Sequence, residues 1–354
     1  MALFYDVTKA ASSKQLSGLI RVSRKMGQAL SNQLAEQYVP VEWHSRKRCF
    51  RVSGSRQEAA FSPQHHFLTP EVFSSDNRPG LYELLSESGV RSAAVFHDAI
   101  PWTHPEITWP KSVERHPQYM NDLSGLDQVF SVSQASQDEL ERYWAAQEIG
   151  SKPELSVVSL GADFFDRSQI DWSHQMSKVP VIVNVGIIEP RKNQAELLEV
   201  ACRLWDGGHE FELHFVGRIN PHFGKPIAKQ IKKAMKSGYP VFLHSKQTDT
   251  NLLDLYSKAS FTVFNSIAEG FGLPVVESIW LGIPCITRNL PSLKNYVGTR
   301  ACIGVENSDD MELAMAKWLG DSAALVDAAE QANSLSMLTW EEAVRPIVDW
   351  KRKG

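Results

Sequence analysis

The clearest structural signal in the chain is the stretch at residues 261–284, which reads FTVFNSIAEGFGLPVVESIWLGIP. Its first four residues, Phe261–Phe264, have the aromatic and β-branched character of a buried strand. Gly270 and Gly272 then indicate a turn, and Pro274 falls where the first turn of a helix tolerates a missing N–H group. The stretch therefore predicts a strand, a glycine turn and a helix in succession.

The chemistry of this turn suits an anion. Backbone N–H groups at residues 270–273 would point toward one position at the start of the helix, where the helix dipole favours negative charge. Glu269 and Glu277 lie on either side, and carboxylates are good acceptors for paired sugar hydroxyls. A phosphate flanked by sugars is the chemistry of a nucleotide sugar. Taken alone, the stretch is equally compatible with a simple turn in which Glu277 only complements the helix N-terminus.

A second strand-turn-helix signal lies at residues 181–194, which read VIVNVGIIEPRKNQ. Arg191 and Lys192 are adjacent in its turn, and cations beside a phosphate-accepting turn would neutralise a departing diphosphate. Adjacent cations are also common on solvated surfaces, and for the pair taken alone that alternative stays open.

Short apolar runs alternate with segments of helical period along the whole chain. This alternation predicts an α/β fold with parallel sheets covered by helices on both faces, and binding sites at the carboxyl ends of the strands. The expected strands are 93–96, 128–132, 156–160, 181–185, 212–216, 241–243, 261–264 and 284–287, with helices at 193–204 and 250–258.

The chain has 354 residues, which at roughly 150 residues per domain predicts two domains. A polar stretch from Asp163 to Val179 is the expected linker between them. The last segment, Trp340 to Gly354, has the pattern of a helix with one apolar side.

Charge and composition exclude several classes of protein. There are 37 Lys and Arg residues against 41 Asp and Glu, a net charge of −4, so we expect no nucleic-acid partner bound through a global positive field. Residues 1–56 contain ten basic and three acidic residues, a net charge of +7. This basic stretch is compatible with a solvated surface and with contact to anionic lipid.

The cysteines and the N-terminus point to the cytoplasm. The 4 cysteines are far apart and form no C-x-x-C pair, so neither a disulfide framework nor a zinc knuckle is indicated. The N-terminal residues do not resemble a signal peptide, and every apolar run is well short of the ~18 residues that span a bilayer. We expect a cytoplasmic protein, with peripheral contact at the inner face of a membrane as the alternative to no membrane contact.

Taken in order, these motifs resemble a known family. Residues 186–193 (GIIEPRKN), the pair Val216-Gly217 and the EGFGLP motif with its second glutamate are similar to the donor half of retaining glycosyltransferases of the GT-B fold, family 4. These are the mannosyltransferase-like enzymes also called glycosyl transferases group 1. The match extends from about Val179 to Gly304.

The resemblance implies a GT-B architecture, in which two Rossmann-like parallel-sheet domains face each other across a cleft. Residues 1–168 would form the N-terminal acceptor-binding domain and residues 169–339 the C-terminal nucleotide-sugar-binding domain. Residues 340–354 would form a helix that crosses back to the N-terminal domain.

The N-terminal half agrees with the family more weakly. His97 and Asp98 resemble its His-Asp strand end, which implies contact with the transferred sugar or the acceptor hydroxyl. Gly18 and Arg21 lie in a segment similar to its glycine loop near the donor phosphates. His97 as a hydrogen-bonded structural residue and Asp98 as the cap of a following turn remain open alternatives.

The resemblance also assigns roles to individual residues. Arg191 and Lys192 would stabilise the departing diphosphate, Glu269 would hold the sugar hydroxyls, and Glu277 the ribose hydroxyls. Many members have Gly-Arg where this chain has Gly186-Ile187, so Arg191 is expected to supply the guanidinium. The residues expected in catalysis are His97, Arg191, Lys192 and Glu269, those in acceptor binding are His97 and Asp98, and those in donor binding are Gly18, Arg21, Gly186, Arg191, Lys192, Gly217, Ser266, Glu269, Gly270, Phe271, Gly272, Leu273 and Glu277.

The implied reaction transfers a hexose from UDP-glucose or GDP-mannose to a saccharide or lipid-linked saccharide in polysaccharide biosynthesis, with retention at the anomeric carbon. Selection of the base is expected at residues 244–248. Because the chain has neither Asp-x-Asp nor an H-x-x-x-H pair, we expect no metal and no cofactor. The alternatives are a non-catalytic nucleotide-sugar-binding protein and a nucleotide-sugar epimerase on the same fold.

Overall fold

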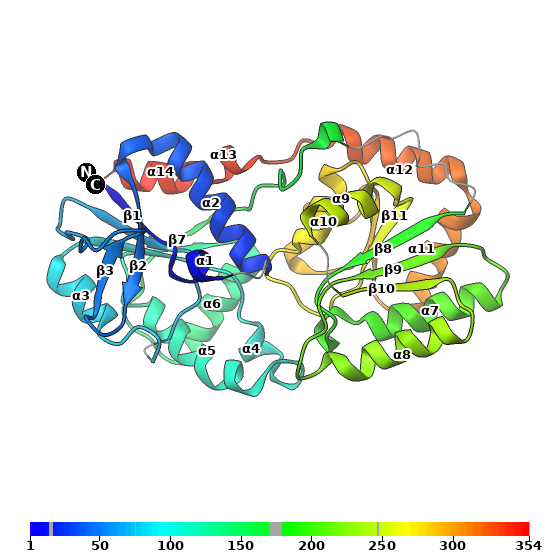
Figure 1. Cartoon of the computed structure of the whole chain (residues 1–354), viewed down its shortest axis with the longest axis horizontal. Helices are drawn as coiled ribbons and strands as arrows, with labels where there is room; N and C mark the ends of the chain where they lie inside the picture. Colours follow the sequence, from blue (N-terminus) through cyan, green and yellow to red (C-terminus); the bar gives the residue numbers. More distant parts are fainter. Residues whose placement is uncertain (14–16, 75, 170–178, 246–247, 354) are drawn as a thin grey trace. The chain divides into compact units, whose positions relative to one another are not determined.

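The computed structural model describes residues 1–13, 17–74, 76–169, 179–245 and 248–353. The chain forms two compact units, Met1–Gly161 with Leu338–Gly354, and Ala162–Met337, and each is described by itself (Figure 1). Both boundaries come a few residues before those expected at 168 and 339. At the first boundary two backbone segments meet closely, since a Cβ added to Gly161 would lie 2.4 Å from the backbone nitrogen of Trp340.

The first unit is built on a seven-stranded sheet in the order β3-β2-β1-β4-β5-β6-β7. All its strands pair in parallel except β2 and β3, which form an antiparallel pair at one edge. The sheet expected to be parallel thus carries one antiparallel strand, because the short connection from β2 to β3 allows only a hairpin. The strands are β1 (Leu3–Asp6), β2 (Tyr38–His44), β3 (Cys49–Val52), β4 (His66–Thr69), β5 (Arg91–Phe96), β6 (Gln128–Ser131) and β7 (Glu154–Val157).

Helices cover both sides of this sheet, with α2 and α14 on one side and α5 and α6 on the other (Figure 1). Serine side chains begin two of them: Ser17 accepts a hydrogen bond from the backbone N–H of Ile20, and Ser133 from that of Ser136. Such caps satisfy N–H groups that have no partner inside the helix. The helices up to residue 161 are α1 (Thr8–Ser12), α2 (Gly18–Leu34), α3 (Leu81–Ser88), α4 (Ile100–Thr103), α5 (Pro110–Leu123) and α6 (Gln134–Ala146), with 3-10 turns at Ala35–Gln37 and Pro105–Ile107.

The end of the chain also packs in the first unit. The one helix expected at 340–354 is instead two, α13 (Trp340–Ala343) and α14 (Arg345–Arg352). The break is explained by Pro346, which has no N–H group to continue the hydrogen bonds of α13. Trp350 of α14 packs edge-on against His66, with ring centroids 4.7 Å apart.

The second unit is built on a six-stranded sheet in the order β10-β9-β8-β11-β12-β13, with all strands parallel. Its strands are β8 (Val181–Val185), β9 (Glu212–Val216), β10 (Val241–His244), β11 (Phe261–Phe264), β12 (Cys285–Arg288) and β13 (Cys302–Val305). Its helices are α7 (Gln194–Asp206), α8 (Gly224–Lys236), α9 (Asp249–Lys258), α10 (Leu273–Trp280), α11 (Ser308–Gly320) and α12 (Ser322–Ser334), with 3-10 turns at Arg167–Gln169, Pro190–Lys192 and Pro291–Leu293.

Both sheets have a topological switch point, where the direction of the strand order reverses. In the first unit this point lies between β1 and β4, and in the second between β8 and β11. Loops that leave the carboxyl ends of such neighbouring strands diverge and open a crevice, which is where ligands bind in doubly wound sheets. The two switch points are therefore the places to examine for a site.

Candidate functional site

Two loops meet at the switch point of the second unit. Residues 186–193 follow β8 and residues 265–272 follow β11, so the two motifs singled out in the sequence are neighbours in the fold. The backbone N–H of Ile267 donates to the Arg191 carbonyl at 2.8 Å, and the Asn265 amide donates to the Asn193 carbonyl at 2.8 Å. These two bonds fix the loops to each other.

Charged side chains from both loops form one cluster. Oε1 of Glu269 accepts hydrogen bonds from Arg191 Nη1 at 2.7 Å and from Lys192 Nζ at 2.5 Å. Arg191 also pairs with Glu189 at 3.1 Å and donates to the Ala268 carbonyl at 3.0 Å. The alternative that Arg191 and Lys192 are a solvated surface pair is therefore wrong.

The electrostatics of this cluster favour a fixed anion beside two cations. Burial raises the pKa of Glu269, but the Arg191 and Lys192 charges outweigh that effect and lower it to about 2. Burial also lowers the pKa of Lys192, against the opposing effect of Glu269. Within the cluster the glutamate stays ionised at neutral pH, and its charge opposes the loss of a proton from Lys192.

Lys192 is held in place along its whole side chain. Only 8% of the residue is exposed, and its ammonium lies 4.6 Å from the centroid of the Phe264 ring, a cation–π contact. Its aliphatic stem passes over Gly186, where an added Cβ would lie 3.3 Å from Lys192 Cδ. A larger residue at 186 would therefore crowd this lysine.

Glycines also shape the backbone around the switch point. An added Cβ on Gly217, which follows β9, would lie 1.9 Å from the Gly186 carbonyl oxygen, so only glycine fits there. Gly272 has a φ of +91° and precedes the first residue of α10, with Pro274 in the first turn. This conformation costs a residue with a side chain more than it costs glycine, and it begins α10 at the end of the loop after β11.

The remaining donor-side candidates lie in or beside the same loop. Ser266, the second residue after β11, is buried, and Phe271 is 8% exposed. Gly270 and Leu273 flank the turn itself. Glu277, on α10, is fully buried, and the hydroxyl of Tyr256 on α9 donates to its Oε2 at 3.3 Å.

The acceptor-side candidates lie in the first unit. His97 follows β5, is buried, and donates from Nε2 to the Pro70 carbonyl at 2.7 Å. Oδ1 of Asp98 accepts the backbone N–H of Ile100 at 3.1 Å, so the turn-capping role considered for Asp98 is present.

Two further donor-side candidates belong to the first unit as well. Gly18 is the first residue of α2, and Arg21 lies in the first turns of the same helix. Both are therefore at a helix start that Ser17 caps.

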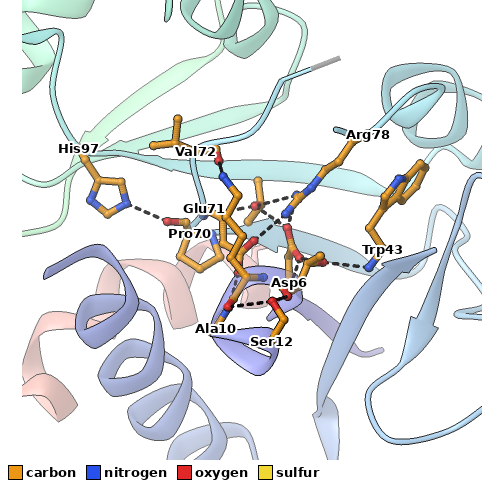
Figure 2. Close-up of polar contacts among 12 residues, drawn as sticks. Asp6, Ala10, Ser12, Trp43, Pro70, Glu71, Val72, Arg78 and His97 are labelled. Carbon is orange, nitrogen blue, oxygen red and sulfur yellow. Dashed lines mark hydrogen bonds and ion pairs between the residues drawn. The ribbon is translucent and has the colours of Figure 1, made fainter. Parts of the chain in front are cut away.

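Sequence reasoning missed a buried ionic cluster at the switch point of the first unit. Figure 2 shows Arg78 between Asp6 and Glu71, with the contacts continuing to Pro70 and His97. One signal was present: Asp6 ends the first strand-like run, which is where a doubly wound sheet places functional or structural polar groups. The partners could not be found because they lie more than 60 residues away.

Two expectations fall partly outside the described residues. The proposed base-selecting stretch, 244–248, includes residues 246 and 247, and the expected linker includes residues 170–178.

Within the described parts of the chain, no group of three or more His, Cys, Asp or Glu side chains is arranged to hold a metal ion. Nor does any described helix combine the length and apolar character needed to cross a membrane.

Two Rossmann-like α/β units, one of which carries glycine turns and paired cations at its switch point, define the GT-B class of fold. Solved structures agree. Sucrose-phosphate synthase from Thermosynechococcus elongatus superposes with a TM-score of 0.70 at 14% identity, over 99% of this chain and 98% of that chain. Anabaena Alr3699/HepE in complex with UDP-glucose superposes with a TM-score of 0.71 at 11% identity, over the whole of both chains.

Sequence comparisons are more specific. Residues 166–335 match the family model described as Glycosyl transferases group 1. The serotype-specific mannosyltransferase WbdA of Escherichia coli is 25% identical over 373 residues, covering 96% of this chain and 45% of the relative. The O-antigen chain mannosyltransferase B of Escherichia coli is 24% identical over 274 residues, covering 73% of this chain and 69% of the relative.

This chain therefore spans less than half the length of WbdA. The family model matches just under half of this chain, within the second unit, and the solved structures share its GT-B fold.

Proposed function

We propose that this protein is a retaining, family 4 glycosyltransferase that moves a hexose from a nucleoside diphosphate sugar to a saccharide or lipid-linked saccharide acceptor. The observation that carries this proposal is the cluster of Arg191, Lys192 and Glu269 at the switch point of the second unit. In this cluster a buried lysine and a partly buried arginine lie beside a glycine turn, where a diphosphate would have its charge neutralised as the bond to the sugar breaks.

The donor contacts follow from the loops. Lys192 and Arg191 bind the diphosphate, and the backbone N–H groups at 270–273 contribute at the N-terminus of α10. Glu269 offers Oε2 to sugar hydroxyls while its Oε1 holds the two cations. Glu277 accepts from the ribose hydroxyls.

The ribose contact requires a local change at α10. Glu277 is fully buried and accepts a hydrogen bond from Tyr256. A bound ribose therefore has to reach a carboxylate that α9 covers, so the Tyr256 hydroxyl either shares Glu277 with the ribose or gives way to it.

The first unit supplies the acceptor side. His97 contacts the acceptor hydroxyl or the transferred sugar, Asp98 shapes that end of β5, and Gly18 and Arg21 contribute to the donor phosphates. The leaving phosphate takes the acceptor proton in a same-face displacement, which needs no nucleophile from the protein and retains the anomeric configuration. The reaction on this proposal uses no metal and no cofactor.

GDP-mannose is the donor to test first, because the two relatives above are named mannosyltransferases; UDP-glucose is the second. Polysaccharide biosynthesis is the proposed pathway class. A cytoplasmic location with peripheral contact at the inner face of a membrane fits a lipid-linked acceptor, and the basic residues of the first 56 positions supply the charge for that contact.

A thermal-shift screen of nucleotide sugars identifies the donor, since a ligand at 100 times its dissociation constant stabilises the folded state by roughly 2.7 kcal/mol. Donor hydrolysis and transfer to saccharide acceptors are then measured with the selected sugar. We expect release of the nucleoside diphosphate and an α-linked product from an α-linked donor. Donor binding without hydrolysis or transfer would support the non-catalytic alternative, and interconversion of free nucleotide sugars the epimerase.

The ribose role of Glu277 has its own test. Glu277→Gln keeps the shape of the side chain and removes its charge, so we expect donor affinity to fall about ten- to a hundred-fold. Tyr256→Phe removes only the covering hydroxyl and serves as the matched control, with a change of less than about tenfold. Equal affinities in wild type and Glu277→Gln would contradict the assignment.

A further inference from the structure

In the ionic cluster of the first unit, the charged side chains pair with one another and are buried. Asp6, Glu71 and Arg78 are between 0% and 5% exposed. Nη2 of Arg78 lies 2.7 Å from Glu71 Oε2, and Nη1 contacts Asp6 Oδ2. A buried guanidinium that pairs with a carboxylate on each side is held in one orientation by charge-assisted hydrogen bonds.

Both oxygens of Glu71 face hydrogen-bond donors. Oε1 accepts the backbone N–H groups of Lys9 and Ala10 at 2.6 and 3.0 Å, and Oε2 accepts from Arg78. An amide at this position could satisfy only one of these sides, because its NH₂ group would face a donor on the other. The two oxygens of Glu71 thus link the segment after β4 to α1 and to Arg78.

The cluster fixes one backbone segment from both ends. The Thr69 hydroxyl donates to Asp6 Oδ2 at 2.7 Å, and the Lys9 ammonium donates to the Val72 carbonyl. Pro70 lies inside this segment, and its ring fixes its own φ. The direction of the Pro70 carbonyl is therefore set by the residues around it.

The Pro70 carbonyl determines which ring nitrogen of His97 carries the proton (Figure 2). It accepts a hydrogen bond from His97 Nε2 at 2.7 Å. A carbonyl oxygen can only accept, so Nε2 carries a proton, and in the neutral ring Nδ1 keeps its lone pair. Burial lowers the pKa of His97, which favours this neutral form. The backbone of His97 is held separately, since Ser136 Oγ donates to its carbonyl at 2.8 Å.

We propose that Asp6, Glu71 and Arg78 are positioning residues for His97, which act through the Pro70 carbonyl to keep the imidazole proton on Nε2 and Nδ1 available as an acceptor. This role deepens the acceptor-side function proposed above and rests on it. An Nδ1 acceptor of fixed direction suits a hydroxyl donor, so the group it receives is a sugar hydroxyl of the acceptor or of the transferred hexose.

The tautomer of His97 tests this role without any activity. We would record the ring nitrogen resonances of the ¹⁵N-labelled full chain, with His97 assigned by a His97→Gln variant. In wild type we expect the proton on Nε2. Glu71→Gln and Thr69→Val change the residues on either side of Pro70, and in both variants we expect part of the population to carry the proton on Nδ1. Wild-type His97 resonances in both folded variants would overturn the proposal.

Kinetics distinguish positioning from a general loss of structure. With transfer from the selected nucleotide sugar to a saccharide acceptor as the readout, we expect Glu71→Gln to lower kcat about tenfold with the donor KM nearly unchanged. In a His97→Ala background the same substitution should change kcat by less than about twofold, because the residue it positions is absent. An undiminished effect in that background would overturn the proposal.

Two controls complete the experiment. Glu42→Gln replaces a carboxylate of the same unit that accepts from Ser53 at 2.6 Å and does not contact the 69–72 segment, so it should leave kcat and the His97 resonances unchanged. If His97 has no role in the proposed transfer reaction, His97→Ala would retain full kcat. The tautomer measurement would still show whether Glu71 and Thr69 position the His97 ring.

Discussion

The two switch points of this molecule share a strand order and differ in what their charges face. In the first unit, Asp6 and Glu71 at the ends of β1 and β4 are occupied by Arg78 and by backbone N–H groups. In the second unit, Arg191 and Lys192 converge on a single oxygen of Glu269, beside a loop built on glycines. The comparison teaches that the same strand order can bring different side chains together: in the first unit they pair with one another and with the backbone, and in the second unit we propose that they bind a diphosphate.

The largest effect should come from removing the Arg78 guanidinium from the ionic cluster of the first unit. Arg78→Met leaves two buried carboxylates without their partner, so we expect a loss of about 3–5 kcal/mol in the free energy of unfolding, measured by denaturant titration. Arg300→Met is the matched control, because its ion pair with Asp327 is exposed and contributes at most about 1 kcal/mol. Equal losses of unfolding free energy in the two variants would show that the ion pairs of Arg78 stabilise the fold no more than an exposed ion pair does.

In the second unit, removal of a cation should affect turnover instead. Lys192→Ala is expected to lower kcat about a hundred- to a thousand-fold, because the departing diphosphate loses a fixed positive charge. Circular dichroism should show an intact fold. Lys258→Ala, which removes an exposed lysine of the same unit, is the control and should keep its turnover. Near-wild-type turnover of Lys192→Ala would remove the contrast between the two regions.

The glycine framework of the second switch point gives a third test. Gly217→Ala places a Cβ 1.9 Å from the Gly186 carbonyl oxygen, so the loops after β8 and β9 must separate. We expect a loss of about 1–3 kcal/mol in stability together with weaker donor binding. At Gly320, the last residue of α11, an added Cβ meets nothing within 4 Å, so Gly320→Ala should be neutral or slightly stabilising.

The two glutamates should respond to pH with opposite sign. The pKa of Glu269 is lowered to about 2 in the folded state, so the stability it provides is present above its ordinary value of 4.5 and is lost as the pH falls toward 2. Burial and the neighbouring Asp6 raise the pKa of Glu71 to about 7, so its protonation stabilises the fold as the pH falls from 7 to 4.5.

Melting temperatures measured against pH check this pair of signs. The advantage of wild type over Glu269→Gln should shrink below pH 4.5, and its advantage over Glu71→Gln should grow between pH 7 and 4.5. Parallel pH profiles for the two variants would contradict the different electrostatics of the two regions.

The sequence predicted the second unit better than the first, for physical reasons. Strands such as Val181–Val185 and Phe261–Phe264 are short, apolar and followed by glycine turns, so their ends were visible locally. In the first unit, β2 and β3 are only partly buried, and their mixed composition gave no clear strand signal. The antiparallel edge was therefore missed.

The same distinction applies to the candidate sites. Arg191, Lys192 and Glu269 belong to two compact motifs, so each could be named from its own neighbours. That Glu269 pairs directly with both cations follows from the strand order, which places β11 beside β8, and no local pattern contains that information. The Asp6, Glu71 and Arg78 cluster depends entirely on such distant contacts.

The central claim is that the diphosphate of a nucleotide sugar binds at the loops after β8 and β11. Isothermal titration of the nucleotide sugar selected by the thermal-shift screen into wild type, Lys192→Ala and Glu42→Gln tests it most directly. We predict that Lys192→Ala weakens binding by at least about tenfold, while Glu42→Gln, in the first unit, binds as wild type does. Unchanged affinity in Lys192→Ala would contradict the claim.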